Sequence, residues 1–362
     1  MTLLVTRRGE VPLPAFFPDA THGAVRATGF EDMERSGLHG LVMNSYHLYN
    51  RPGARLIKRL GGLHRFTGYG GTILTDSGGF QLFSLIRENP AYGEIRDGEI
   101  IFRPDQGREK VIFTPEKCIQ AQLQYGSDIA MALDLCTHPD DPPEAQRRSV
   151  ELTVKWGARC RAEFDKLTRG MTDEKPLLFG IVQGGGDRAL RLECGRRLAE
   201  IGFDGYGFGG WPLDSAGQLR DDILQAAADA MPDELPKYAM GLGRPEEIVR
   251  CVRMGYGLFD CVIPTREARH QRLYMFRENC ATPEGVRRAD GKFYGFYYAL
   301  DDKHVADGRP IEEGCDCALC KRHSRAYLHH LFKVGDAQAL RLATAHNLRF
   351  YGRVMELLRA EE

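Results

Sequence analysis

The stretch TILTDSGGF, residues 72–80, predicts a short buried strand that ends at a carboxylate. Threonine, isoleucine and leucine favour extended backbone in a sheet, and the two glycines after Asp76 end the strand in a turn. The run shows no alternation of apolar and polar residues. Such a strand is buried on both faces, which is typical of a parallel sheet covered by helices.

The same pattern recurs along the chain. We predict eight strands, each ending in glycine, a polar residue or proline, at 14–19, 40–45, 71–76, 128–134, 177–183, 205–210, 237–242 and 258–263. Apolar residues at three- and four-residue intervals predict helices at 114–125, 144–164, 187–201, 219–231 and 245–254. Strands that alternate with helices in this number predict an α/β protein, a (β/α)8 TIM barrel rather than an open doubly wound sheet.

The composition limits the class of protein. The 362 residues include 49 basic and 50 acidic side chains, for a net charge of −1. This balance excludes a protein held on nucleic acid by overall positive charge, so any such site must be a local patch. The first residues are apolar for too short a run to be a secretion signal, and no run approaches the ~18 apolar residues of a membrane span. We therefore expect a cytoplasmic protein without membrane contact.

Polar residues gather at the predicted carboxyl ends of the strands, where barrels of this type carry their active sites. They are Asp76, Asp134, Gln183, Gly209 with Gly210, Met240 with Gly241, and Asp260. A single carboxylate at such a position is often only a helix cap. Three carboxylates and an amide from four strands, all expected on one face, favour catalysis.

The residue types indicate what this face binds. An inward-facing glutamine and aspartate complement the donor and acceptor edges of a flat heterocycle, and the two glycines let backbone groups approach its rim. Phe80 either stacks on the ring or is an ordinary core residue. The two remaining carboxylates would then attend a bond-breaking centre, as in glycoside cleavage, where one attacks an anomeric carbon and the other handles the proton.

Three of the ten cysteines are clustered near the C-terminus. Cys315, Cys317 and Cys320, with His346, supply three thiolates and an imidazole, which fill a tetrahedral Zn²⁺ site and leave no position for water. We therefore predict a structural zinc. Unrelated reduced thiols are the alternative, and His329 and His330 are competing fourth ligands.

The alternation of strands and helices fails in two places. The stretch 87–113 shows no helical pattern and predicts an insertion with hairpin character after the third strand. Residues 277–314 are rich in turns and precede the clustered cysteines and two helical stretches, 324–334 and 337–359. We predict a catalytic barrel over 1–276 and a zinc-binding subdomain over 277–362, whose C-terminal helices complete the barrel.

These motifs together resemble the tRNA-guanine transglycosylases, enzymes that exchange a guanine in tRNA for a 7-deazaguanine. The resemblance covers nearly the whole chain, through NSYHL (44–48), RPG (51–53), TDSGGFQ (75–81), GSDI (126–129), GIVQG (180–184), MGLG (240–243), FDCVIPTR (259–266), CDCALC (315–320) and SRAYLHH (324–330). It implies exchange at the wobble guanine of the anticodon, in the queuosine pathway, without a nucleotide cofactor. Members of the family are usually dimers, which implies a homodimer.

The resemblance also implies a role for each strand-end residue. Asp260 would be the nucleophile that bonds to the ribose anomeric carbon and expels guanine, and Asp76 the general base that deprotonates the incoming base. The remaining residues would hold the base, namely Asp134, Gln183 and the backbone around Gly210 at its edge, with Phe80 and Met240 on its two faces.

One loop departs from the family pattern. The usual Gly-Gly-Leu followed by small residues is here GGWPLD, residues 209–214. Pro212 has no N–H, so the peptide between Trp211 and Pro212 accepts a hydrogen bond but cannot donate one. Guanine offers the acceptor N7 at this edge, whereas a 7-deaza base lacks it and can carry an amine donor. We expect a preference for a 7-substituted deazaguanine with such a donor. The bulk of Trp211 and Leu213 counts against the larger queuine, unless Trp211 turns outward onto the RNA.

A second departure is rich in arginine. The run REARHQRLY, residues 266–274, and the neighbours of the cysteine cluster supply a local basic surface that the net charge hides. Its members are Arg266, Arg269, Arg272, Lys321, Arg322 and Arg325. They either bind RNA phosphates, in which case affinity falls steeply with salt, or are only solvated.

Three other functions are weighed against this one. A paralogue with the same chemistry would act on another nucleic acid, such as DNA, or insert another deazaguanine. A non-catalytic tRNA-binding subunit would lack the nucleophile or the base, whereas Asp260 and Asp76 are both present. A glycosidase barrel is disfavoured by the cysteine cluster and by the base-edge pair Asp134 and Gln183.

Overall fold

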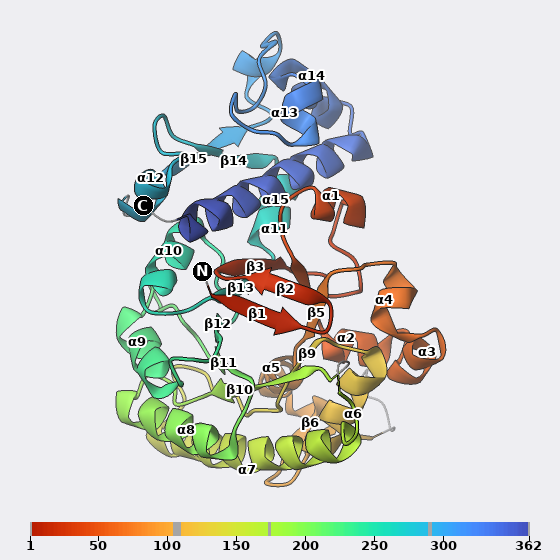
Figure 1. Ribbon diagram of the computed structural model, residues 1–362, viewed down its shortest axis with the longest axis vertical. Coiled ribbons are helices and arrows are strands. Elements are labelled where there is room, and N and C mark those ends of the chain that lie inside the picture. The colour runs from red at the N-terminus through yellow and green to blue at the C-terminus, as the bar shows by residue number, and fades with distance from the viewer. Residues whose placement is uncertain (1, 104–109, 173–174, 289–291, 361–362) are drawn as a thin grey trace.

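The computed structural model describes residues 2–103, 110–172, 175–288 and 292–360, and its centre is a barrel of eight parallel strands (Figure 1). The strands are β3 (Ala15–Pro18), β4 (Gly40–Met43), β5 (Thr72–Thr75), β9 (Ile129–Met131), β10 (Leu177–Val182), β11 (Gly205–Phe208), β12 (Lys237–Ala239) and β13 (Leu258–Cys261). Their order around the sheet is β3-β13-β12-β11-β10-β9-β5-β4. A parallel bridge between Asp19 and Val42 joins the first strand to the last. The predicted α/β barrel is confirmed.

Two layers of apolar side chains explain why the strands do not alternate. Phe17 packs with Leu74, Phe179 and Leu258 in the interior of the barrel. Its neighbour Phe16 packs in the larger cluster between the strands and the helices. Both faces of each strand are therefore buried, as expected for a parallel sheet.

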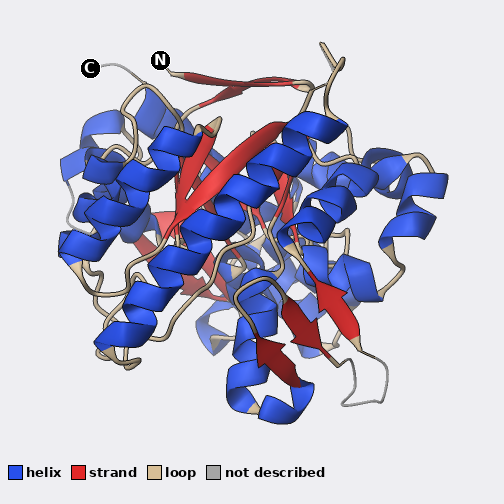
Figure 2. Cartoon of the chain, turned by 90° about the horizontal axis from the view of Figure 1, so that it is seen from below, coloured by secondary structure: helices blue, strands red, loops and turns tan. Residues whose placement is uncertain are grey.

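The N-terminal hairpin closes the amino end of the barrel (Figure 2). Its strands β1 (Leu3–Thr6) and β2 (Gly9–Pro12) are antiparallel, and Leu4 and Val11 add to the interior cluster. The Arg7 guanidinium binds the buried carboxylate of Asp128, which lies just before β9. The opposite end, where the strands finish, stays available for a site.

Helices follow the strands and cover the barrel. They are α1 (Phe30–Glu34), α2 (Ser45–Asn50), α3 (Ala54–Arg59), α4 (Gly62–Thr67), α5 (Gly79–Glu88), α6 (Pro115–Tyr125), α7 (Pro143–Leu167), α8 (Arg188–Ile201), α9 (Asp221–Ala230), α10 (Pro245–Arg253) and α11 (Ile263–Arg269). The five predicted helices correspond to α6–α10. Side-chain caps fix two of their starts, since Thr114 accepts from the Lys117 N–H and Asp187 from the Ala189 N–H. The sequence pattern does not indicate α5, because glycines open it.

The predicted insertion contains a small antiparallel sheet. It consists of β6 (Gly93–Ile95), β7 (Ile100–Phe102) and β8 (Val111–Phe113), after a 3-10 turn at Pro90–Tyr92. Helix α5 extends to Glu88, so it covers the first two positions of the predicted insertion. Residues 104–109 of that insertion lie outside the described residues.

The described part of the C-terminal region contains a two-stranded sheet and four helices. These are β14 (Arg272–Phe276), β15 (Tyr294–Tyr298), α12 (Pro283–Arg288), α13 (Ala318–Arg322), α14 (Arg325–Lys333) and α15 (Ala337–Arg359), with a 3-10 turn at Asp302–His304. Helix α15 runs from this region back along the barrel (Figure 1), where Tyr351 donates to the Gly243 carbonyl and Asn347 to the Pro264 carbonyl. The pair β14–β15 spans the predicted domain boundary at 276/277.

None of the helices in the described ranges combines the length and the apolar character that a membrane crossing requires.

Candidate active site

The carboxyl ends of the strands surround a pocket of about 250 Å³. The residues that the sequence assigns to catalysis and base binding all line this one pocket; they are Asp76, Phe80, Asp134, Gln183, Gly210, Trp211, Met240 and Asp260. They come from six different strands or the segments that follow them. The barrel therefore brings together side chains separated by up to 184 positions in the sequence.

Asp76 follows β5 and is held by several donors. Its Oδ2 accepts from the Asn44 amide at 2.6 Å, and its Oδ1 accepts from the backbone N–H groups of Ser45 at 2.8 Å and Gly78 at 3.1 Å. Burial nevertheless raises the pKa of Asp76 to about 7, because the cost of holding a charge away from water exceeds what these donors return. This carboxyl group can take and release a proton near neutral pH.

Asp260, near the end of β13, is oriented through one oxygen. Its Oδ1 accepts from the Tyr238 hydroxyl at 2.6 Å and from the Gly241 N–H at 2.7 Å. Gly241 has a φ of +71°, a left-handed conformation that favours glycine and aims its N–H at the carboxylate. Oδ2 accepts no hydrogen bond from the described residues. Burial raises the pKa of Asp260 to about 6. The side chain is a fixed carboxylate with one available oxygen.

Asp134 and Gln183 form a buried pair on the neighbouring strands. The Gln183 amide donates to Asp134 Oδ2 at 2.6 Å, and Ser77 donates to Oδ1 at 3.2 Å. Burial raises the pKa of Asp134 to about 6. The Gln183 Oε1 atom is buried and finds no partner among the described residues. A Cβ on Gly209 would lie 2.4 Å from the Gln183 amide nitrogen, so this glycine keeps the space open. An unpaired buried acceptor is expected to receive a donor from a ligand.

The faces of the pocket are apolar. Phe80 lies in the first turn of α5 and is 43% exposed, so it is a residue of the pocket mouth and not of the core. Met240 is half-buried and lines the wall after β12. Trp211 and Pro212 line the pocket from the loop after β11.

Four further residues shape this site, although the sequence assigns no role to them. Asn44 and Ser45 follow β4 and hold Asp76, and Tyr238 holds Asp260. Asp19 follows β3, and its negative charge raises the pKa of both Asp76 and Asp260. Asn44 and Asp19 carry the same strand-end signal that identified the others. Tyr238 lies within a strand, and only the barrel geometry places it.

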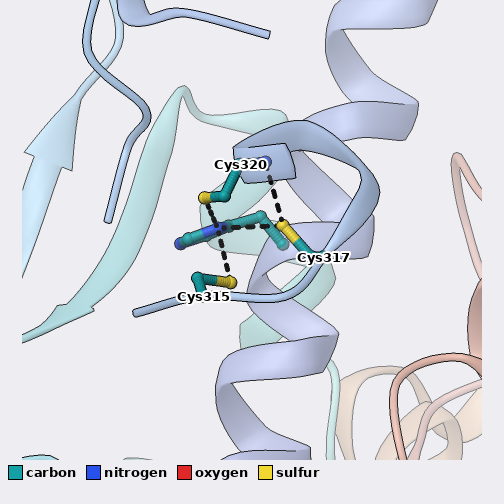
Figure 3. A group of neighbouring side chains, drawn as sticks. Cys315, Cys317 and Cys320 are labelled. Atoms are coloured by element: carbon teal, nitrogen blue, oxygen red, sulfur yellow. Dashed lines mark hydrogen bonds between the residues drawn. The ribbon is translucent and has the colours of Figure 1, made fainter. Parts of the chain in front are cut away.

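The four predicted metal ligands also come together (Figure 3). The Sγ atoms of Cys315, Cys317 and Cys320 lie 3.7, 3.5 and 3.3 Å from Nδ1 of His346. Zn–S bonds of about 2.3 Å and Zn–N bonds of about 2.0–2.1 Å place such atoms about 3.6 Å apart in a tetrahedron. The cluster therefore fits a metal ion, and its spacing is consistent with zinc.

The second ring nitrogen of His346 explains its orientation. Nε2 lies 2.7 Å from the Tyr274 carbonyl, which can only accept, so Nε2 carries the hydrogen and Nδ1 faces the thiols. Within the described residues the cluster contains neither His329 nor His330, the competing ligands. His329 is buried elsewhere on α14, and His330 is exposed.

The predicted basic residues do not line the pocket and differ in their surroundings. Arg266, Lys321 and Arg322 are exposed, and Arg269 is half-buried. Arg272 pairs with Glu267. Arg325 instead binds the Asp307 carboxylate and the carbonyls of Pro310 and Ile311, so its guanidinium is engaged inside the C-terminal region.

Comparison with known proteins gives a consistent result. The family model described as queuine tRNA-ribosyltransferase matches residues 1–361. The chain is 40% identical over 356 residues to the queuine tRNA-ribosyltransferase of Syntrophobacter fumaroxidans, covering 98% of this chain and 88% of that protein. It is 41% identical over 359 residues to the protein of the same name from Pseudoalteromonas atlantica, covering 97% of this chain and 88% of the relative.

Proposed function

This chain belongs to the queuine tRNA-ribosyltransferase family, and we propose that it exchanges the wobble guanine of a tRNA anticodon for a 7-substituted 7-deazaguanine through a covalent bond to Asp260. One observation carries the proposal. Two carboxylates with raised pKa values, Asp76 and Asp260, line the same pocket as the base-edge pair Asp134 and Gln183.

The first half of the exchange uses Asp260 as the nucleophile. Its Oδ2 attacks the ribose C1′ while the bond from C1′ to guanine N9 breaks, through an oxocarbenium-like transition state. The electron pair of the broken bond leaves with guanine. Tyr238 and Gly241 bind Oδ1 and so leave Oδ2 directed at the sugar.

The second half uses Asp76 as the base. It takes the N9 proton of the incoming base, N9 then attacks C1′, and the bond from C1′ to Asp260 breaks with its electrons returning to the carboxylate. Exchange of guanine for guanine has two mirror-image halves, so Asp76 in its acid form gives the same proton to the leaving guanine. A pKa of about 7 suits both tasks. The covalent intermediate keeps the ribose activated while one base leaves and another enters.

The pair Asp134 and Gln183 would recognise the base. Asp134 can accept from the amide and amino N–H groups of a guanine-like edge, and Gln183 Oε1 offers a further acceptor. Phe80 and Met240 would hold the two faces of the ring.

The loop after β11 would select the substituent of the incoming base. The Trp211 carbonyl accepts no hydrogen bond from the described residues, and Pro212 removes the N–H that would bind guanine N7. An aminomethyl group at C7 supplies a donor to such a carbonyl. In Pro212→Ala we expect guanine to gain binding relative to the aminomethyl base, as measured by competition for labelled guanine incorporation. Unchanged relative binding would contradict this preference.

We also propose that Cys315, Cys317, Cys320 and His346 hold a structural Zn²⁺. All four positions of a tetrahedral ion would be filled by protein, which leaves none for a substrate. The ion would fasten α13 to α15 and so to the barrel.

We propose that the exposed cations near the site contact RNA phosphates. Arg266 lies on α11, which follows the strand of the nucleophile. Arg325 contributes less, because its partners lie within the protein. Binding of a tRNA anticodon stem-loop should weaken steeply between 50 and 200 mM salt, by about 10-fold or more for a few phosphate contacts. A flat response would count against these contacts.

The decisive experiment measures incorporation of radiolabelled guanine into unmodified tRNA that has guanine at the first anticodon position. We expect incorporation with the wild type and none with Asp260→Ala. Only the wild type should yield an RNA–protein adduct that survives denaturing electrophoresis. Equal incorporation by both proteins would defeat the assignment of the nucleophile, and the same RNA with adenine in place of the target guanine serves as the substrate control.

A further inference from the structure

An aromatic rim of Phe80, His138 and Trp211 stands at one side of the pocket mouth. The three residues come from α5, from the loop after β9 and from the loop after β11. The Trp211 ring centroid lies 5.8 Å from that of Phe80 and 5.3 Å from that of His138. The interplanar angles are 61° and 67°, so neither ring is stacked parallel on the indole.

Trp211 is also unusually open for its type, with 40% of its surface exposed. A large apolar side chain exposed at a pocket mouth suggests a ligand surface. The loop that carries it is firmly held, because Arg191 donates to the Gly209 carbonyl, the Arg220 N–H donates to the Pro212 carbonyl, and Leu213 bridges to Leu219. A ring fixed in this way loses little conformational entropy when it binds.

The proposed reaction creates a need for such a surface. A nucleotide whose sugar–base bond is to be cut must leave the base stack, and its neighbours then lose a stacking partner. An exposed ring beside the pocket can replace that partner, because bases stack readily on aromatic side chains. Arg266 on α11 lies after β13, two strands from β11 in the barrel, so one RNA strand can reach both this cation and the aromatic rim.

We propose that Trp211 is a stacking platform for a nucleobase that directly flanks the target guanosine in single-stranded RNA. The inference rests on the proposed function and extends it from the exchanged base to its neighbour. Of the two alternatives for Trp211, the proposal favours a side chain turned outward onto the RNA. The other alternative was a side chain whose bulk excludes a large substituent on the incoming base.

The chain allows a direct optical test, because it has only two tryptophans. Trp156 is fully buried and donates to the Asp97 carbonyl, so Trp211 is the tryptophan that a ligand can reach. In Asp260→Asn protein, which prevents turnover, we expect an anticodon stem-loop to quench the fluorescence. The quenching should disappear in Asp260→Asn with Trp211→Phe added, and with RNA that is abasic at one flanking position.

Steady-state kinetics provide the second measurement. Trp211→Ala should raise the KM for the stem-loop by about 5- to 100-fold and the KM for guanine by much less, and Trp211→Tyr should restore most of the loss. Phe66→Ala is the matched control, since Phe66 is 40% exposed on α4, away from the pocket, and should leave both KM values unchanged.

Four results would overturn the proposal. Quenching that persists with both flanking positions abasic would show that no neighbouring base stacks on Trp211. Quenching by free guanine equal to that by RNA, or a rise in the KM for guanine as large as that for the stem-loop in Trp211→Ala, would show that Trp211 acts on the exchanged base and not on its neighbour. If the wild type incorporates no guanine into tRNA, the proposed function fails first, whereas normal incorporation without an effect of Trp211 defeats this inference alone.

Discussion

The active-site pocket and the cysteine cluster are both built from side chains that lie far apart in the sequence. They differ in whether their polar atoms find partners within the protein. In the cluster, three thiols surround Nδ1 of His346, and Nε2 of the same ring donates to the Tyr274 carbonyl. In the mouth, Asp260 Oδ2 and Gln183 Oε1 have no partner among the described residues. A site that holds structure satisfies its polar groups internally, whereas a reactive site leaves some of them for a substrate.

The difference extends to electrostatics. Asp134 is buried, and Asp76 and Asp260 are half-buried. None of the three has a cationic side chain bonded to it in the described part of the chain, and loss of contact with water raises all three pKa values to about 6 or 7. Asp128 at the opposite end of the barrel is bound by His64 and Arg7, which lower its pKa although burial opposes this. The same fold thus stabilises the anionic form of Asp128 at one end of the barrel and the protonated form of the pocket carboxylates at the other.

Removal of the proton-handling group at the mouth should give the largest effect. Asp76→Asn cannot take the proton of the incoming base, so the exchange rate should fall by about 10³-fold with little change in stability. The measurement is guanine incorporation at saturating RNA, with circular dichroism as the check on folding. Glu246→Gln, outside the pocket, is a control that should retain activity. Wild-type activity in Asp76→Asn would show that Asp76 does not transfer the proton.

Loss of one thiol from the cluster should act on stability instead. Cys317→Ser removes a ligand from the proposed metal site and should lower the free energy of unfolding by about 3 kcal/mol. Denaturant unfolding and metal analysis check this result. Cys280→Ser, a half-buried cysteine outside the cluster, should cost much less. Normal stability without bound metal in Cys317→Ser would show that the cluster does not work as a metal site.

The pH dependence of kcat/KM should separate the roles of Asp260 and Asp76. In the proposed mechanism Asp260 attacks as the anion and Asp76 protonates the leaving guanine, so kcat/KM for RNA should peak between the apparent pKa values of about 6 and about 7. It should fall about 10-fold per pH unit on either side. The acid side reflects protonation of the nucleophile, and the alkaline side reflects loss of the proton from the acid. A profile that stays flat from pH 5 to 8 would contradict these roles.

The smallest expected effect concerns Asp19. Its negative charge raises the pKa values of Asp76 and Asp260, so Asp19→Asn should lower both and move the whole profile toward acid pH. The shift should be less than about one pH unit, because burial and not charge repulsion is the main cause of the raised values. Thr21→Val, which removes only the hydroxyl that donates to Asp19, is the control for local packing. A shift toward alkaline pH would exclude this electrostatic role.

The sequence alone predicted those features that depend on the residues of a single short segment. The run TILTDSGGF identified both a buried strand and the carboxylate at its end, and the spacing of Cys315, Cys317 and Cys320 indicated a metal site before any fold was known. The helices with side-chain caps or long apolar periodicity were predicted for the same reason. Helix α5 was missed, since two glycines at a helix start look like a turn when the surrounding packing is unknown.

The amino-acid sequence by itself determined the barrel, the set of polar residues at the strand ends and the ligand set of the cluster, because these depend on local periodicity and spacing. Only the tertiary structure decided that burial raises the pKa of Asp76, that Tyr238 orients Asp260, that Arg325 is engaged internally and that Trp211 stands partly exposed at the pocket mouth. Each of these properties depends on groups that are distant along the chain. Burial and hydrogen bonding are created when the barrel closes, so no single stretch of sequence contains them.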